Sequence, residues 1–231
     1  MRRLDIIRVL GVVSAGKEAR IYRAVTREGS ELALKIYLTS TREFRKSIWK
    51  YIIGDPRFER EKITSSKKLM ALWARKEYKN LRELFEAGVR VPEPRGVLEN
   101  IVAMEFIGEE GRPAPSLREN PPQTSEEALE LFNTLIHYVE LSFCEAELVH
   151  ADLSEYNVLV WRGRPVIIDV GQAVSIKHPN ALEFLIKDLS NLTRYFGREL
   201  GLDVPQPSAL LEVVTRCSER RRDRSAPLRS T

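Results

Sequence analysis

The sequence is short of cysteine and of long apolar runs, and both shortages exclude classes of protein. Its 231 residues include only two cysteines, Cys144 and Cys217, which are too few for a disulfide framework and too far apart for a short-spaced metal motif. We therefore expect two unpaired thiols. No stretch reaches the roughly 20 apolar residues of a membrane-spanning helix, and the first residues contain no apolar secretion signal. The expectation is a cytoplasmic protein that has no membrane partner.

Positive charge is concentrated in two segments. The net charge is +4, and residues 216–231 account for all of it, with six arginines against two acids. A second segment, residues 41–68, has nine basic residues against four acids. Such segments favour an anionic partner such as RNA, although solvated chain without a partner has the same composition. We expect the tail to be disordered, and the 41–68 segment to be mobile and exposed because few apolar residues follow Ile53.

The spacing of apolar residues predicts an α+β chain. Strand-like runs occur at residues 4–13, 19–25, 31–37, 95–98 and 101–106, and a small hairpin at 158–161 and 166–170. Helical spacing occurs at residues 41–53, 67–87, 124–146, 179–200 and from 208 into the tail. Thr124 and Glu127 form a capping box, in which each side chain can bond the other residue's backbone amide.

This order of elements divides the chain into four parts. We predict an N-terminal lobe at residues 1–107, with an antiparallel sheet and one long helix. A hinge and linker rich in glycine, proline and charge follows at 108–123, and a mainly helical C-terminal lobe at 124–215. The basic tail, 216–231, ends the chain.

Three polar residues near the predicted hairpin carry the clearest chemical signal. Asp152 and Asn157 bracket a short loop before the hairpin, and Asp169 follows its second strand, so these side chains can converge. Phosphoryl transfer requires such a group, with one carboxylate to orient the acceptor hydroxyl, and an amide oxygen and a second carboxylate to hold Mg²⁺ on the phosphates. Taken singly, each residue is more typical of a turn.

The run H-A-D-L-S-E-Y-N at residues 150–157, with I-D-V-G at 168–171, resembles the RIO family of atypical protein kinases. Both runs depart from the H-R-D and D-F-G forms of most protein kinases. The resemblance implies a bilobal protein-kinase-like fold in which Asp152 is the catalytic base and Asn157 and Asp169 bind the metal. His150 is expected to be structural. The short interval between Asp169 and Pro179 leaves no room for an activation segment.

The N-terminal half contains a matching lysine. Lys35 lies within an apolar strand, where an uncompensated ammonium is costly, so it needs a partner. Glu77 on the long helix is the candidate. In kinases such a pair directs the lysine toward the α and β phosphates, so we expect Lys35 and Glu77 to belong to the catalytic group.

The first turn, S-A-G-K-E-A at residues 14–19, resembles the phosphate loop of the type-one RIO branch. It is not a Walker A motif, because Glu18 stands where a hydroxyl must bind Mg²⁺ and a strand follows where a helix is required. The resemblance assigns nucleotide binding to this turn and to a hinge before the linker. The residues are Val13, Ser14, Ala15, Gly16, Lys17 and Glu18 in the turn, and Met104, Glu105 and Ile107 in the hinge.

The resemblance implies transfer of the γ-phosphate of ATP, with Mg²⁺ or Mn²⁺, to a protein substrate or to the chain itself. It also implies a role in maturation of the small ribosomal subunit, on its precursor particle and ribosomal RNA. Because the usual platform for a peptide substrate is truncated, ATP hydrolysis is a variant of this hypothesis. The alternatives are a small-molecule phosphotransferase of the aminoglycoside or choline kinase type, and a non-catalytic RNA-binding module. The S-A-G-K-E-A and I-D-V-G runs argue against the first, and the complete set of catalytic residues against the second.

Overall fold

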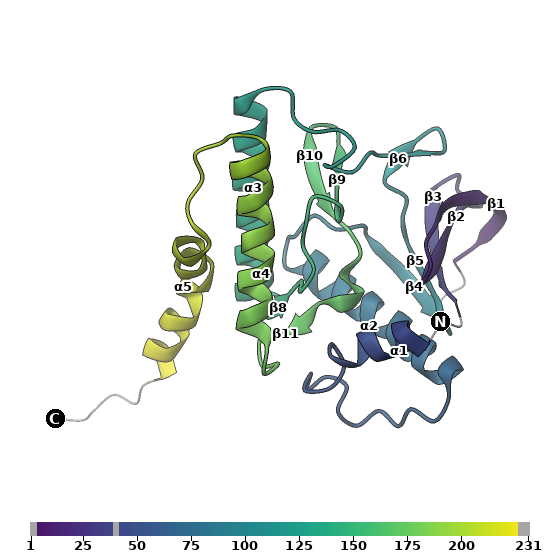
Figure 1. The fold of residues 1–231 in the computed structure, drawn as a ribbon. Coiled ribbons are helices and arrows are strands. Elements are labelled where there is room, and N and C mark those ends of the chain that lie inside the picture. The colour runs from purple at the N-terminus through teal and green to yellow at the C-terminus, as the bar shows by residue number, and fades with distance from the viewer. Residues whose placement is uncertain (1–3, 39–41, 226–231) are drawn as a thin grey trace.

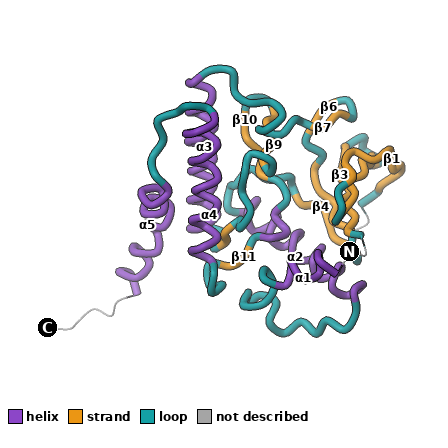
Figure 2. Tube along the Cα trace, in the orientation of Figure 1, coloured by secondary structure: helices purple, strands orange, loops and turns teal. Residues whose placement is uncertain are grey.

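The computed structural model describes residues 4–38 and 42–225 and shows two lobes of different construction (Figure 1). Strands of the N-terminal sheet gather on one side of the molecule, and the long helices of the C-terminal lobe on the other (Figure 2). Buried apolar residues from both lobes form one continuous core. The lobes are therefore packed together and not joined only through the linker.

Five antiparallel strands form the N-terminal sheet, in the order β1-β2-β3-β5-β4. They are β1 (Ile6–Ala15), β2 (Ala19–Thr26), β3 (Glu31–Tyr37), β4 (Pro94–Leu98) and β5 (Ile101–Glu105). The central strand β3 is buried on both faces. Leu32 and Leu34 pack into a small cluster, whereas Ala33 and Tyr37 belong to the main core. Any polar side chain on β3 must therefore find a partner inside the protein.

Two helices accompany the sheet. The long helix α2 (Ser66–Glu86) lies against β4 and β5, and its buried stripe includes Leu69, Leu72 and Trp73. Ser65 caps α2, because its hydroxyl accepts a hydrogen bond from the Lys68 amide at 3.2 Å. A shorter helix, α1 (Arg42–Trp49), precedes it.

The C-terminal lobe is built on α3 (Ser125–Cys144), α4 (Ala181–Thr193) and α5 (Pro207–Ser225). The last turn of α4 continues as a π-helix at Arg194–Glu199. Short antiparallel pairs lie between the helices: β9 (Val158–Trp161) with β10 (Arg164–Ile167), and β8 (Leu148–Val149) with β11 (Val174–Ser175). A further pair, β6 (Gly108–Glu109) with β7 (Arg112–Pro113), lies in the predicted linker. None of the helices within 4–38 and 42–225 has the length and apolar character needed to cross a membrane.

The predicted capping box at the start of α3 is present in only one of its two hydrogen bonds. The Thr124 hydroxyl accepts a hydrogen bond from the Glu127 amide at 3.1 Å, as predicted. The Glu127 carboxylate accepts from the Gln123 amide at 2.9 Å, one residue before the amide that the motif names. The side chain still satisfies a backbone donor at the helix start.

The prediction that residues 41–68 are mobile and exposed is wrong for the packing of residues 44–58, whereas most side chains of residues 59–68 are exposed as expected. Phe44, Ile48, Tyr51 and Phe58 are buried in the main core. The Asp55 carboxylate is fully buried and forms an ion pair with Arg57 at 2.7 Å. These buried side chains and the ion pair fix this largely polar segment against the main core.

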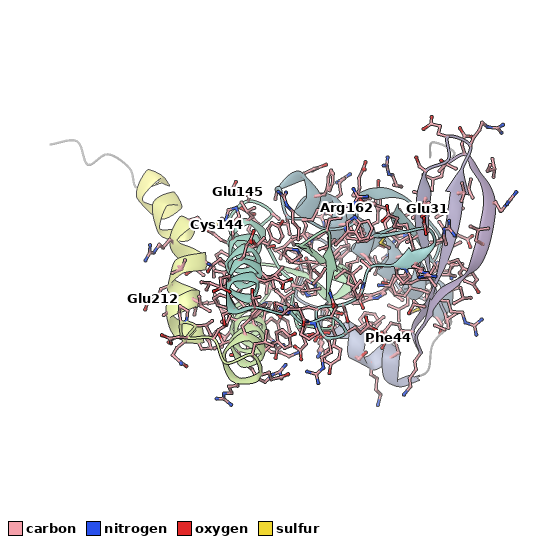
Figure 3. The ribbon with its side chains drawn as sticks, turned by 90° about the horizontal axis from the view of Figure 1, so that it is seen from above. Glu31, Phe44, Cys144, Glu145, Arg162 and Glu212 are labelled. Carbon is pink, nitrogen blue, oxygen red and sulfur yellow. A yellow bond between two sulfur atoms is a disulfide. The ribbon has the colours of Figure 1, made fainter. Side chains whose placement is uncertain are left out.

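Two predictions about the C-terminal part of the chain are also wrong. Cys144 and Cys217 form a disulfide bond, with their Cα atoms 5.8 Å apart. Packing of α5 against α3 and α4 brings the two residues together, and Figure 3 shows Cys144 on the side of α3 that faces α5. Helix α5 continues to Ser225, so residues 216–225 are helical where disorder was expected. Residues 226–231 lie outside the described part.

Breaking the disulfide should lower the stability of the C-terminal lobe. The bridge closes a loop between residues 73 positions apart, and a disulfide of that span contributes about 2–4 kcal/mol. We expect dithiothreitol to lower the urea midpoint of the wild-type protein. The control is Cys217→Ser, which should start from the lower midpoint and not respond to dithiothreitol. Two free thiols in the oxidised, unfolded wild-type protein would contradict the bridge.

Candidate active site

The predicted catalytic loop lies between β8 and β9 and is held by α4. The Asp188 carboxylate on α4 accepts hydrogen bonds from the amides of Ala151 and Leu153, both at 2.8 Å. These amides flank Asp152, and Ala151 has a left-handed φ of 69°. Asp188 therefore fixes the backbone on both sides of the predicted base.

Two further bonds shape the same loop. Asn157 Nδ2 donates to the Asp152 carbonyl at 2.8 Å, which ties the two ends of the loop together. The buried His150 ring contacts the Ile168 carbonyl through Nε2 at 3.1 Å and receives the Asp152 amide at Nδ1. Burial lowers the pKa of His150. Its contacts are those of the structural residue that the sequence indicated.

Lys35 joins the two lobes. Its Nζ donates to Glu77 Oε1 at 2.6 Å, the predicted pair, and to Asp169 Oδ1 at 2.7 Å. The Tyr37 hydroxyl, on the same strand, donates to the other Glu77 oxygen at 2.5 Å. Glu77 is therefore held on both oxygens, and its position on α2 is fixed relative to β3.

The charges of this group depend on one another. Burial raises the pKa of Glu77, although Lys35 counteracts the effect. Lys35 lowers the pKa of Asp169. Burial opposes the charge on Lys35, but Asp169 and Glu77 together raise its pKa well above the usual value. At neutral pH the lysine is thus a fixed positive charge, as a phosphate ligand must be.

The Asp152 side chain is partly exposed and accepts from Lys187 Nζ of α4 at 3.1 Å. Burial raises the pKa of Glu18 in the β1–β2 turn, and the charges of Asp169 and Asp152 add to this effect. Glu18 is therefore close enough to both carboxylates to feel their charge.

Asn157 and Asp169 suit a magnesium ion. The bond from Asn157 Nδ2 uses the amide nitrogen and leaves the amide oxygen for a metal. The Asp169 side chain is 48% exposed, although one of its oxygens bonds Lys35. Two hard oxygen donors with further positions open to phosphate and water match the usual Mg²⁺ site in phosphoryl transfer. Across residues 4–38 and 42–225 no cluster of three or more His, Cys, Asp or Glu residues could hold a metal by protein ligands alone.

The remaining predicted residues lie around this group. Val13, Ser14 and Ala15 are in β1, and Gly16, Lys17 and Glu18 lead into β2, which is a strand as expected. Met104 is buried in β5 and paired with Ala33 of β3. The Glu105 amide donates to the Glu93 carbonyl, and the Ile107 carbonyl accepts from the Ala114 amide. These bonds occupy the Glu105 amide and the Ile107 carbonyl, so the Glu105 carbonyl and the Ile107 amide are the groups that the predicted hinge would offer to a purine.

Sequence reasoning missed five residues that shape the site. Asp188 and Lys187 are adjacent in α4, where they read as one polar interruption of an apolar stripe. Tyr37 reads as an ordinary strand residue. Lys76 and Asn80 flank Glu77 in a K-E-x-x-N run, and that run is the signal from which they could have been found.

A family model for the RIO domain matches residues 20–209. The chain belongs to the RIO domain family. Curated relatives include the serine/threonine-protein kinase RIO1 of Caenorhabditis elegans, 40% identical over 215 residues that cover 93% of this chain and 42% of the relative. The human RIO1 kinase is 40% identical over 91% of this chain and 37% of its own length. The Rio1 kinase of Haloferax volcanii is 40% identical over 89% of this chain and 68% of its own length.

Solved structures agree with the fold of this RIO chain. The Rio2 kinase of Chaetomium thermophilum superposes with a TM-score of 0.66 at 23% identity, covering 96% of this chain and 75% of that one. The same kinase, in an ADP/Mg²⁺-phosphoaspartate complex, superposes with a TM-score of 0.65 at 22% identity, covering 94% of this chain and 68% of that one. The fold is therefore protein-kinase-like, as expected. The chain spans about two fifths of the length of the C. elegans and human relatives.

The buried Asp188 should make stability depend on pH. Burial raises its pKa to about 8, while the two amide bonds act in the opposite direction. Because the native carboxyl then holds its proton where the unfolded one has lost it, stability should fall as pH rises between about 4 and 8, by up to about 1.4 kcal/mol per pH unit. Urea unfolding at several pH values measures the slope. Asp188→Asn should flatten it, and equal slopes in both proteins would contradict the assignment.

Proposed function

We propose that this chain is an atypical serine/threonine kinase that transfers the γ-phosphate of ATP to a hydroxyl group. One observation carries the proposal: Lys35 is held between Glu77 and Asp169, and the loop that bears Asp152 and Asn157 is fixed beside them. The names of the curated relatives support the same activity.

Each residue then has a defined task. Lys35 binds the α and β phosphates, and Glu77 with Tyr37 keeps it directed at them. Asn157 and Asp169 would hold Mg²⁺, and the ion would supply positive charge beside the phosphates. Asp152 accepts a hydrogen bond from the acceptor hydroxyl, orients it and takes its proton. The Glu105 carbonyl and the Ile107 amide bond the adenine edge, which favours ATP over GTP.

Hydrolysis of ATP is a variant of this activity. The interval after Asp169 is occupied by a short 3₁₀ turn (Val170–Gln172) and β11, which leaves no extended platform for a peptide. A water molecule can then take the place of the hydroxyl. The phosphoaspartate described for the Rio2 kinase of Chaetomium thermophilum adds an enzyme carboxylate as a third acceptor. Incubation with radiolabelled ATP and Mg²⁺ separates the three, since the label enters free phosphate, a hydroxylamine-stable protein bond or a hydroxylamine-labile one.

Ribosomal RNA in the precursor of the small subunit is the proposed partner, and the cytoplasm the proposed location. The support is exposed positive charge. Arg57 pairs with Asp55 and Glu83, but Arg60 and Lys62 in the loop after α1 are exposed, as are Lys67 and Lys68 in the first turn of α2. Lysine and arginine side chains on a surface are the usual contacts to a phosphate backbone.

Removing the base should separate catalysis from binding. Asp152→Asn should lower phosphoryl transfer by about a hundredfold or more, because the acceptor loses its base, while ADP affinity by calorimetry stays near wild type. Asp169→Asn should instead weaken the Mg²⁺-dependent part of ADP binding. Asp203→Asn, an exposed carboxylate outside the site, is the control. Wild-type turnover in Asp152→Asn would overturn the assignment of the base.

The RNA proposal predicts a salt-dependent interaction with two contributions. Deleting residues from Glu219 onward removes most tail arginines and should lower both affinity for a ribosomal RNA fragment and its salt slope, which reports about three to five released counterions. Arg60→Gln with Lys62→Gln tests the folded surface in the same way. If neither variant changes affinity or slope, the basic segments are not an RNA interface.

A further inference from the structure

The backbone that directly follows Asp169 is held by side chains of α2. Lys76 Nζ donates to the Gly171 carbonyl at 2.9 Å and also to the Ala173 carbonyl. Asn80 Nδ2, one helical turn later, donates to the Val170 carbonyl at 2.7 Å and to the Ala173 carbonyl at 3.0 Å. These two side chains thus bond three of the four carbonyls from Val170 to Ala173.

Lys76 is an unusual residue for its position. It is fully buried, and its ammonium lies 5.3 Å from the Trp73 ring and 5.8 Å from the Phe58 ring. Among the residues that the structure describes, its hydrogen-bond partners are the two main-chain carbonyls, and it forms no ion pair. Burial, with the Arg57 guanidinium, lowers its pKa. An apolar side chain of equal length would fill the same space without this desolvation cost, so the two carbonyl bonds are what a lysine adds here.

A second element supports the same segment from the other side. Arg57 donates to Asn80 Oδ1 at 2.8 Å and to the Ala173 carbonyl at 3.3 Å. The Asp55 carboxylate, which pairs with Arg57, accepts from the Ser175 amide at 3.3 Å. The Asn80 amide is therefore fixed in orientation, with its oxygen on Arg57 and its nitrogen on the carbonyls.

We propose that Lys76 and Asn80 form a backbone clamp that positions Asp169 for phosphate and metal binding. Asp169 itself has a left-handed φ of 56°, so the chain turns sharply there and the direction of its carboxylate depends on the segment that follows. Glu77 is adjacent to Lys76, so one helix fixes both the partner of Lys35 and the backbone behind Asp169. This role rests on the proposed phosphoryl transfer.

Hydrogen exchange tests the clamp without nucleotide or turnover. Lys76→Met removes the donors and keeps the length of the side chain. We expect the amides of residues 170–175 to exchange about tenfold faster, the effect of losing about 1.4 kcal/mol of hydrogen bonding from the two bonds of Lys76, while the β-sheet amides stay near wild type. Asn80→Leu should likewise speed the exchange of the amides of residues 170–175, because it removes the bonds to the Val170 and Ala173 carbonyls. Lys79→Met, on the same helix and partly exposed, is the matched control and should leave them unchanged.

Measurements of ADP binding then show whether Lys76 positions Asp169 or only stabilises the fold. In Lys76→Met, the Mg²⁺ concentration that half-saturates ADP binding should rise about tenfold, whereas ADP affinity in EDTA stays the same. A residue that only stabilises the fold would lower the melting temperature and leave the Mg²⁺ requirement unchanged. Unchanged exchange at 170–175 in both clamp variants overturns the proposal. If Lys76→Met does not fold, Asn80→Leu decides alone. Failure of the kinase assignment shows separately, as absence of transfer in the wild-type protein.

Discussion

The arrangement of the two lobes depends on the buried ammonium group of Lys35, which needs carboxylate partners inside the protein. Lys35 occupies a strand that is buried on both faces, so its charge can persist only beside carboxylates. Glu77 meets it from α2, and Asp169 meets it from the segment after the β9–β10 hairpin. These two partners come from different lobes. The ion pairs therefore set the place of α2 against the sheet and the place of the C-terminal lobe against both.

The same principle explains how a site without an activation segment stays assembled. Buried polar contacts are weak as sources of net stability, but each is satisfied in only one arrangement. Lys76, Asn80 and Arg57 all donate to the Ala173 carbonyl, so a displacement of α2 or of the turn after Asp169 would leave several buried groups without partners. A helix held in this way has little freedom to swing, and the catalytic arrangement is built into the fold.

The sequence could predict what depends on short spacing. Local patterns place Lys35 on a strand, Glu77 on a helix, and three further residues, Asp152, Asn157 and Asp169, in loops, and the structure has them there. Their catalytic roles stay predictions. The packing of residues 55–58 was not predictable in this way, because Arg57 and Phe58 stand alone in a polar stretch without periodicity. The disulfide was missed for a related reason, since it depends on how α5 lies against α3 and not on the spacing of the cysteines.

Two helices hold the residues of the candidate site: α2 holds Lys35 and the backbone after Asp169, and α4 holds the loop that carries Asp152. On α2, Glu77 bonds Lys35, and its neighbour Lys76 bonds the backbone that follows Asp169. On α4, Asp188 bonds the loop that carries Asp152, and its neighbour Lys187 contacts Asp152 itself. In each helix, consecutive residues point about 100° apart, so one reaches backbone and the other reaches a site side chain. The distance between the proposed base and the proposed phosphate site therefore depends on how the two helices pack in the common core.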